Sequence, residues 1–105
     1  MKYTIEFVSK YEIGDIVSYS DKSGTNTIGI INSIEFDEKE YKFVYKIIND
    51  YHISYDNEAI IMEFSEGVTE DKILTRANNN LKVLLMKEEM QKFIYKQDEY
   101  YPSTH

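Results

Sequence analysis

The sequence contains no cysteine, and it has only one proline and four glycines among 105 residues. Without cysteine the chain cannot form a disulfide framework, a thiolate metal site or a cysteine nucleophile. Its apolar runs are far shorter than a membrane-spanning helix requires, and its first residues include no apolar run of signal-peptide length. These absences predict a cytoplasmic protein with no membrane partner.

Positive charge, and arginine above all, is also scarce. One arginine and eleven lysines stand against 19 acidic residues, so the net charge is −7. A surface built to recognise phosphates or bases usually contains more arginine. The excess of residues with AT-rich codons, including ten tyrosines, indicates an AT-rich genome, such as that of a low-GC bacterium or one of its phages. A hydrophobic share of 42% predicts one globular domain rather than disorder.

Alternating apolar and polar residues predict six short strands in the first part of the chain. These strands are expected over residues 2–8, 13–19, 27–36, 41–48, 51–55 and 59–64, with turns at 20–26, 37–40, 49–50 and 56–58. Within 27–36, the side chains of Ile28, Ile30, Ile34 and Phe36 are predicted to share one face. Gly24 is expected at a loop tip and Gly29 at a bulge or sharp bend of the sheet.

From Gly67 the pattern favours helix. Thr69 is a candidate cap for a helix that begins with Glu70 and Asp71 and is interrupted at 78–80. A second helix is expected to end near Gln97, although residues 81–86 are also compatible with a strand. Together these patterns predict a single α+β domain. Residues 1–66 would form a small, strongly bent antiparallel sheet or SH3-like barrel, 67–97 one or two C-terminal helices that cover it or pair with a second copy, and 98–105 a frayed tail.

Residues 11–64 resemble the small SH3-like barrels of the KOW and Tudor type. The resemblance is carried by "YEIGDIVSY", a glycine-bearing loop, "TIGIINSIEF", and "YKFVYKII" followed by a short strand. Members of this type bind nucleic acid, modified peptides or other proteins and rarely catalyse. The resemblance therefore implies a binding module, without specifying its ligand.

Catalytic and metal-binding residues are few. His52 and His105 are the only histidines, and no serine lies in a nucleophile-elbow motif, so we expect neither an enzyme nor a cofactor or metal site. Asp21, Glu40 and Lys42 have a spacing seen in metal-dependent nucleases. Such a set arises often by chance in a chain with 30% charged residues, and the simpler interpretation is a charged turn beside a hairpin.

The most unusual charge feature is a stretch from Ile47 to Asp71 that contains seven acidic residues and no lysine or arginine. It is either a solvated surface that keeps the protein soluble or a patch that binds a basic partner. The leading hypothesis is an acidic protein-binding module, specifically a phage or mobile-element inhibitor that covers a basic, nucleic-acid-handling surface of a host protein. The predicted patch contains Asp50, Asp56, Glu58, Glu63, Glu66, Glu70 and Asp71.

A second hypothesis assigns the protein to nucleic-acid binding. Lysines and tyrosines lie close together on neighbouring predicted strands, where tyrosines can stack on bases. The net charge opposes this function unless the lysines form a positive stripe, and core packing explains the tyrosines equally well. The residues of this alternative site are Lys39, Lys42, Lys46, Tyr41, Tyr45, Tyr51 and Tyr55.

Overall fold

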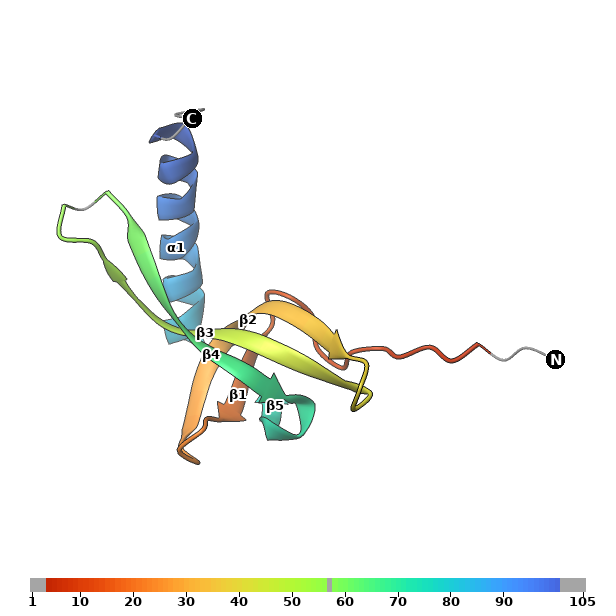
Figure 1. Ribbon diagram of the computed structural model, residues 1–105. Coiled ribbons are helices and arrows are strands. Elements are labelled where there is room, and N and C mark those ends of the chain that lie inside the picture. Colours follow the sequence, from red (N-terminus) through yellow and green to blue (C-terminus); the bar gives the residue numbers. More distant parts are fainter. Residues whose placement is uncertain (1–3, 57, 101–105) are drawn as a thin grey trace.

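A computed structural model describes residues 4–56 and 58–100, with the side chains of residues 93–100 excepted. It contains one five-stranded antiparallel sheet followed by a helix (Figure 1), which confirms the predicted α+β class. In chain order the elements are β1 (Ile16–Ser20), β2 (Asn26–Asp37), β3 (Lys42–Ile53), β4 (Ile60–Thr69), the 3-10 turn η1 (Glu70–Lys72), β5 (Ile73–Arg76) and α1 (Leu81–Tyr100).

The strand order in the sheet is β4-β3-β2-β1-β5, so the outermost strands are β4 and β5. These two strands are not paired with each other, and the sheet therefore does not close into a barrel. A curled five-stranded sheet of this order remains compatible with a small barrel-like fold. No helix among residues 4–56 and 58–100 is long and apolar enough to cross a membrane.

Register shifts interrupt the pairing of the long strands. The register between β2 and β3 shifts between Ile31 and Ser33, which leaves Asn32 as an extra, exposed residue. A bulge of this kind changes which side chains face each side of the strand. Ile28 and Ile30 therefore pack on the side of α1, whereas Ile34 packs on the opposite side. The prediction that Ile28, Ile30, Ile34 and Phe36 share one face is wrong for this reason.

The sheet separates two hydrophobic clusters. The first lies inside the curl of the sheet and contains Tyr11, Val17, Tyr19, Ile31, Tyr45, Ile47, Val68 and Ile73. The second lies between the sheet and the helix and contains Ile16, Ile30, Ile48, Ile60, Val83 and Met90. Val83, Met86 and Met90 face the sheet, as their spacing predicted. Leu81, Leu84 and Leu85 are exposed on α1, and homodimerisation through this helix stays a prediction.

Gly29 is the position where the curl brings two strands unusually close. A Cβ atom built on Gly29 would lie 2.4 Å from the backbone oxygen of Ile48 and 2.6 Å from the Cγ2 of Ile47. Only a residue without a side chain fits this approach of β3 to β2. The predicted role of Gly29 in shaping the sheet therefore has a direct steric basis.

Several predicted elements are corrected. Residues 4–8 form no strand despite their alternation, and residues 1–3 lie outside the described residues. Asn49 and Asp50 do not form a turn, because β3 continues through them to Ile53. The pairing of β3 with β4 instead shifts register between Ile48 and Asp50. The turn predicted at 37–40 is present between β2 and β3.

The helix predicted from Thr69 is also wrong. β4 extends to Thr69, Glu70–Lys72 form only a 3-10 turn, and Ile73–Arg76 form β5. Ile73 is buried in the first cluster and β5 pairs with β1, so tertiary packing overrides the helical signal of the acidic first turn. The sheet thus extends beyond residue 66, and residues 98–100, predicted to fray, belong to α1, while 101–105 lie outside the described residues.

Candidate protein-binding surface

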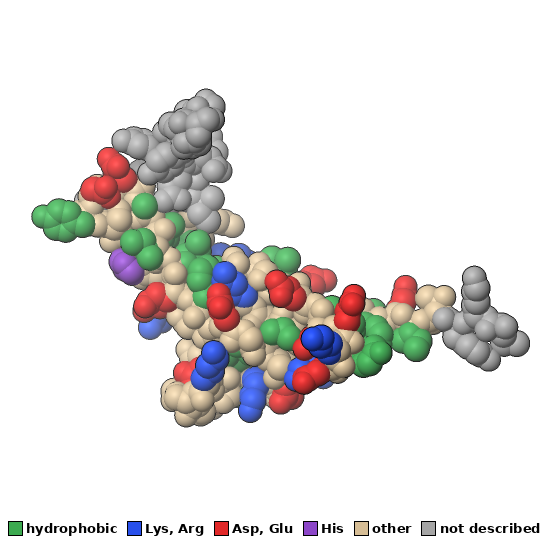
Figure 2. Space-filling view, viewed as in Figure 1, with side chains coloured by type: hydrophobic (Ala, Val, Ile, Leu, Met, Phe, Trp, Pro, Cys, Tyr) green, Lys and Arg blue, Asp and Glu red, His purple; other side chains and the backbone are tan. Residues whose placement is uncertain are grey.

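The outer half of the β3–β4 hairpin projects from the sheet beside α1 (Figure 1). We call residues 49–63 the β3–β4 arm, of which the structure describes all but residue 57. The arm contains no lysine or arginine, and Figure 2 shows acidic side chains near its end. The arm is the part of the acid-only stretch that extends furthest from the rest of the sheet.

Four of the seven predicted acidic residues belong to this arm. Asp50 on β3 lies directly opposite Glu63 on β4, and both are exposed. Asp56 and Glu58 lie in the turn at the tip, where the Asp56 carboxylate accepts hydrogen bonds from the Ser54 hydroxyl at 2.5 Å and the Glu58 backbone N–H at 3.1 Å. These bonds, the Ser54 bond most strongly, hold the pKa of Asp56 below its usual value. The tip therefore stays negatively charged at neutral pH.

The other three acidic residues lie at the opposite end of β4, where they have partners. Glu66 is 3.5 Å from the Nζ of Lys46, and Glu70 accepts a hydrogen bond from the Lys10 backbone N–H at 3.0 Å. Asp71 accepts a hydrogen bond from the Thr69 hydroxyl, which lowers the pKa of Asp71. The predicted acidic patch is therefore divided in space, and only the arm remains strongly acidic.

Apolar and aromatic surface accompanies the charge on the arm. Tyr55 is fully exposed at the tip, and Ile61 is 45% exposed on β4. The base of the arm is held to the helix, because the Tyr51 hydroxyl donates a 2.7 Å hydrogen bond to Glu89 on α1. This bond also raises the pKa of Tyr51. A groove of about 610 Å³ runs along the same junction, lined by Ile28, Tyr51, Val83, Leu85, Met86 and Glu89 among others.

The alternative lysine and tyrosine site is not gathered on one surface. Tyr45 is completely buried in the first cluster, and burial raises the pKa of its hydroxyl. Tyr41 lies in the turn before β3, whereas Tyr55 lies just beyond the other end of that strand and Tyr51 faces α1. The four tyrosines therefore cannot form one stacking platform for bases.

Acidic neighbours offset two of the three lysines of that site. The Lys42 Nζ is 2.5 Å from Glu40, which raises the pKa of Lys42, and Lys46 pairs with Glu66 while its Nζ lies 4.2 Å from the centre of the Phe64 ring. Lys39 lies on the exposed β2–β3 turn, where its backbone N–H donates to Asp37. The three lysines therefore do not form a continuous positive stripe.

The nuclease-like residues are also separated. Asp21 lies in the β1–β2 turn, where it accepts backbone hydrogen bonds from Ser23 and Thr25, both at 2.9 Å. Glu40 and Lys42 lie at the far end of β2, a 12-residue strand that spans roughly 40 Å when extended. His52 is exposed on β3. The part of the chain that the structure describes contains no group of three or more histidine, aspartate or glutamate side chains that could hold a metal ion.

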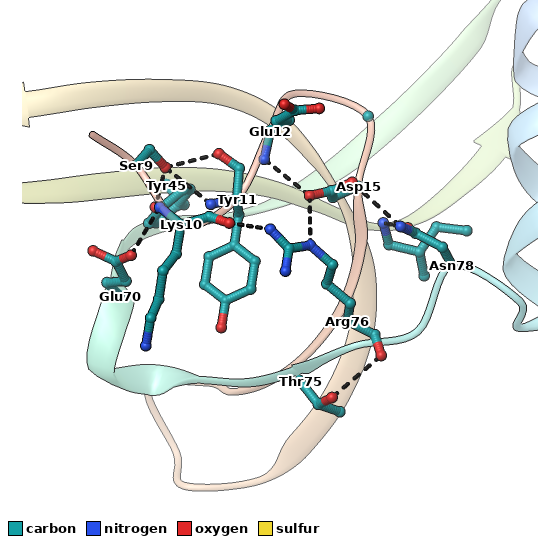
Figure 3. Close-up of polar contacts among 12 residues, drawn as sticks. Ser9, Lys10, Tyr11, Glu12, Asp15, Tyr45, Glu70, Thr75, Arg76 and Asn78 are labelled. Carbon is teal, nitrogen blue, oxygen red and sulfur yellow. Dashed lines mark hydrogen bonds and ion pairs between the residues drawn. The ribbon is translucent and has the colours of Figure 1, made fainter.

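Sequence reasoning missed a polar network that fastens the chain before β1 to the end of β5 (Figure 3). The Arg76 Nε lies 3.2 Å from Asp15, its terminal nitrogen donates to the Lys10 carbonyl, and its guanidinium lies 4.9 Å from the centre of the Tyr11 ring. Asn78 donates to Asp15 and accepts a 2.6 Å bond from the Ile16 N–H. The only arginine of the chain was the available signal, and its role here is structural.

Comparison with known proteins adds no further constraint. No protein-family model matches the chain, and neither a curated protein nor a solved structure matches it significantly.

Proposed function

We propose that this protein is a non-catalytic module that binds a protein with a basic surface through the β3–β4 arm. The observation that carries the proposal is the register of the hairpin, which sets Asp50 directly opposite Glu63. Like charges directly opposite each other destabilise an antiparallel pair. A lysine or arginine of a partner placed between these carboxylates would relieve that repulsion. Binding would therefore remove a destabilising interaction that is present in the free protein.

The surroundings of the acidic pair suit a protein partner. Tyr55 and Ile61 offer aromatic and apolar contact area beside the charge, and tyrosine is enriched among the residues that dominate interface energetics. The acidic field of the arm would accelerate encounter with a basic surface and make association sensitive to salt. The specific form of the proposal is an inhibitor, encoded by a phage or mobile element, that covers a nucleic-acid-handling surface of a host protein.

Kinship with the SH3-like barrels of the KOW and Tudor type is part of the same proposal. The strand order and the 3-10 turn before the last strand support it at the level of architecture. A binding role fits an SH3-like sheet, but the arm rather than a barrel surface would provide the contacts. Binding of nucleic acid through Lys39 and its neighbours remains the competing hypothesis.

The test is capture of partners from a lysate of a low-GC bacterium, with and without nuclease treatment, followed by affinity measurement with two matched variants. Asp50→Asn with Glu63→Gln removes two charges from the arm, and Glu35→Gln with Glu38→Gln removes two exposed charges elsewhere. We expect the arm variant to bind the captured protein at least tenfold more weakly than the control variant does. Equal affinities, or a partner that is lost with nuclease treatment, would contradict the proposal.

A further inference from the structure

The sheet forks beside α1, and the groove at the base of the arm lies in this fork. Ile30 with Ile48 is the last pair that joins β2 to β3 in the direction of the arm. A Cβ atom on Gly29 would lie 2.4 Å from the Ile48 backbone oxygen, so the two strands are in contact at this point. Beyond it, Figure 1 shows β2 running toward the β1–β2 turn while β3 continues into the arm. The groove of about 610 Å³ is within the usual size range of ligand-binding clefts.

Both strands that line the groove have an edge without a strand partner. Thr27 and Ile28 of β2 pair with β1 but not with β3. Asp50 and Tyr51 of β3 pair with β4 but not with β2. Unpaired strand edges accept extended segments, because their N–H and C=O groups can continue the hydrogen-bond ladder. The groove therefore suits an extended peptide better than a compact small molecule.

The helix wall of the groove is apolar and only partly covered. Val83 is buried and Met86 is half-buried, whereas Leu85 is 58% exposed although it lines the groove. An apolar side chain of a bound segment would remove the Leu85 side chain from water, which favours binding. The wall thus provides a contact for one apolar residue of a ligand.

Two carboxylates of the groove lie at the two ends of Tyr51. The Asp50 carboxylate accepts a 2.8 Å hydrogen bond from the Tyr51 backbone N–H, and the Glu89 carboxylate accepts a 2.7 Å bond from the Tyr51 hydroxyl. The bond to Glu89, and to a smaller extent the charge of Asp50, raise the pKa of that hydroxyl. Among the described residues that line the groove, Lys82 is the one cation, and no ion pair joins it to either carboxylate. A ligand cation along the Tyr51 ring would therefore face two carboxylates as well as an aromatic surface.

We propose that the groove binds an extended segment of the basic partner, with a lysine or arginine along Tyr51 and an apolar residue on Leu85. Charge complementarity selects this occupant, since two carboxylates outnumber one lysine in the described lining. The inference rests on the proposed function, because it names the part of the basic partner that the protein holds. The groove and the arm form one continuous contact surface, because Asp50 belongs to both.

The probe is a short blocked peptide in which valine alternates with arginine, and its control has glutamate in place of arginine. Each peptide is titrated into isotope-labelled protein up to about 1 mM, and the amide NMR signals are followed. Leu85→Lys removes the apolar contact and adds a cation to the groove. Leu84→Lys is the matched control, because Leu84 is 40% exposed on α1 and lies outside the described lining of the groove. Lys82→Gln removes the competing cation.

We expect the arginine peptide to cause saturable shifts at the residues that line the groove. Its affinity should be about tenfold lower for Leu85→Lys than for Leu84→Lys, and about threefold higher for Lys82→Gln than for the wild type. Absence of these shifts, equal shifts with the glutamate peptide, or weaker binding by Lys82→Gln would overturn the inference. Groove shifts that follow protein concentration without any peptide would also overturn it, because the occupant would then be a second copy.

A second comparison separates failure of this inference from failure of the proposed function. Glu63 lies on the arm but outside the described lining of the groove, so Glu63→Gln should weaken binding of the captured protein without changing affinity for the arginine peptide. If Leu85→Lys then binds the captured protein as well as Leu84→Lys does, the arm contact stands and the groove inference is wrong. If the peptide binds as expected while Glu63→Gln leaves binding of the captured protein unchanged, the groove holds basic segments and the arm contact is wrong.

Discussion

Substitution of Gly29 tests the account of the curled sheet. In Gly29→Ala the new Cβ would lie 2.4 Å from a backbone oxygen of β3, and a backbone atom cannot move aside as a flexible side chain can. Overpacking of this kind typically costs about 1–3 kcal/mol. The replacement of glycine by alanine offsets about 0.5–1 kcal/mol by reducing the freedom of the unfolded chain. We therefore expect a net loss of about 1 kcal/mol in the free energy of unfolding.

Urea unfolding followed by circular dichroism measures this loss. With a denaturant slope of about 1–3 kcal/mol/M, the midpoint should fall by about 0.5 M. Gly24→Asn is the control, because that position has a φ of 83°, which asparagine tolerates, and open space around it. Its midpoint should stay close to that of the wild type. An unchanged or higher midpoint for Gly29→Ala would refute the close approach of β3 to β2.

Three further predictions concern charge and the arm. Burial by itself would raise the pKa of Asp15, but hydrogen bonds from the Glu12 N–H, Arg76 and Asn78 outweigh it, so the pKa is lowered. Asp15→Asn removes a carboxylate that these donors stabilise and should cost about 1 kcal/mol of unfolding free energy at pH 7. Because the folded pKa lies below the unfolded value of about 3.9, this difference should shrink as the pH falls below about 4 in unfolding measurements. Glu63→Lys should stabilise the fold by about 0.5 kcal/mol by pairing with Asp50, while abolishing partner binding; a loss of stability would contradict the charge repulsion. Tyr51→Phe removes the bond to Glu89 and should accelerate amide exchange on the arm without changing exchange in β1.

The sequence predicted the class of fold because its signals were local and consistent. Turn residues at 20–26 and 37–40 separate β-forming runs, and the spacing of Val83, Met86 and Met90 fits one face of a helix. It failed where tertiary packing decides the outcome. Acidic residues after Thr69 look like the start of a helix, yet pairing of β5 with β1 and burial of Ile73 impose a strand. Similarly, bulges at Asn32 and Asn49 could not be placed by alternation alone.

The candidate site was only partly predictable from the sequence. The acid-only composition of Ile47 to Asp71 identified the arm, but it could not show that Lys46 pairs with Glu66 or that the Lys10 backbone N–H donates to Glu70. The burial of Tyr45 likewise depends on the curl of the sheet. The alternation of residues 2–8 indicated a strand, and in the described part of that segment Phe7 packs on the hairpin end instead.

The central claim is that the β3–β4 arm binds a basic protein, and an amide hydrogen-exchange footprint of the complex tests it most directly. Exchange is compared for the free chain and for the chain bound to the protein captured after nuclease treatment. The account predicts that slowed exchange concentrates in residues 49–63, with a smaller effect at 0.5 M salt because surface charge is then screened within about 4 Å. Slowed exchange confined to residues 37–46, with none on the arm, would contradict it.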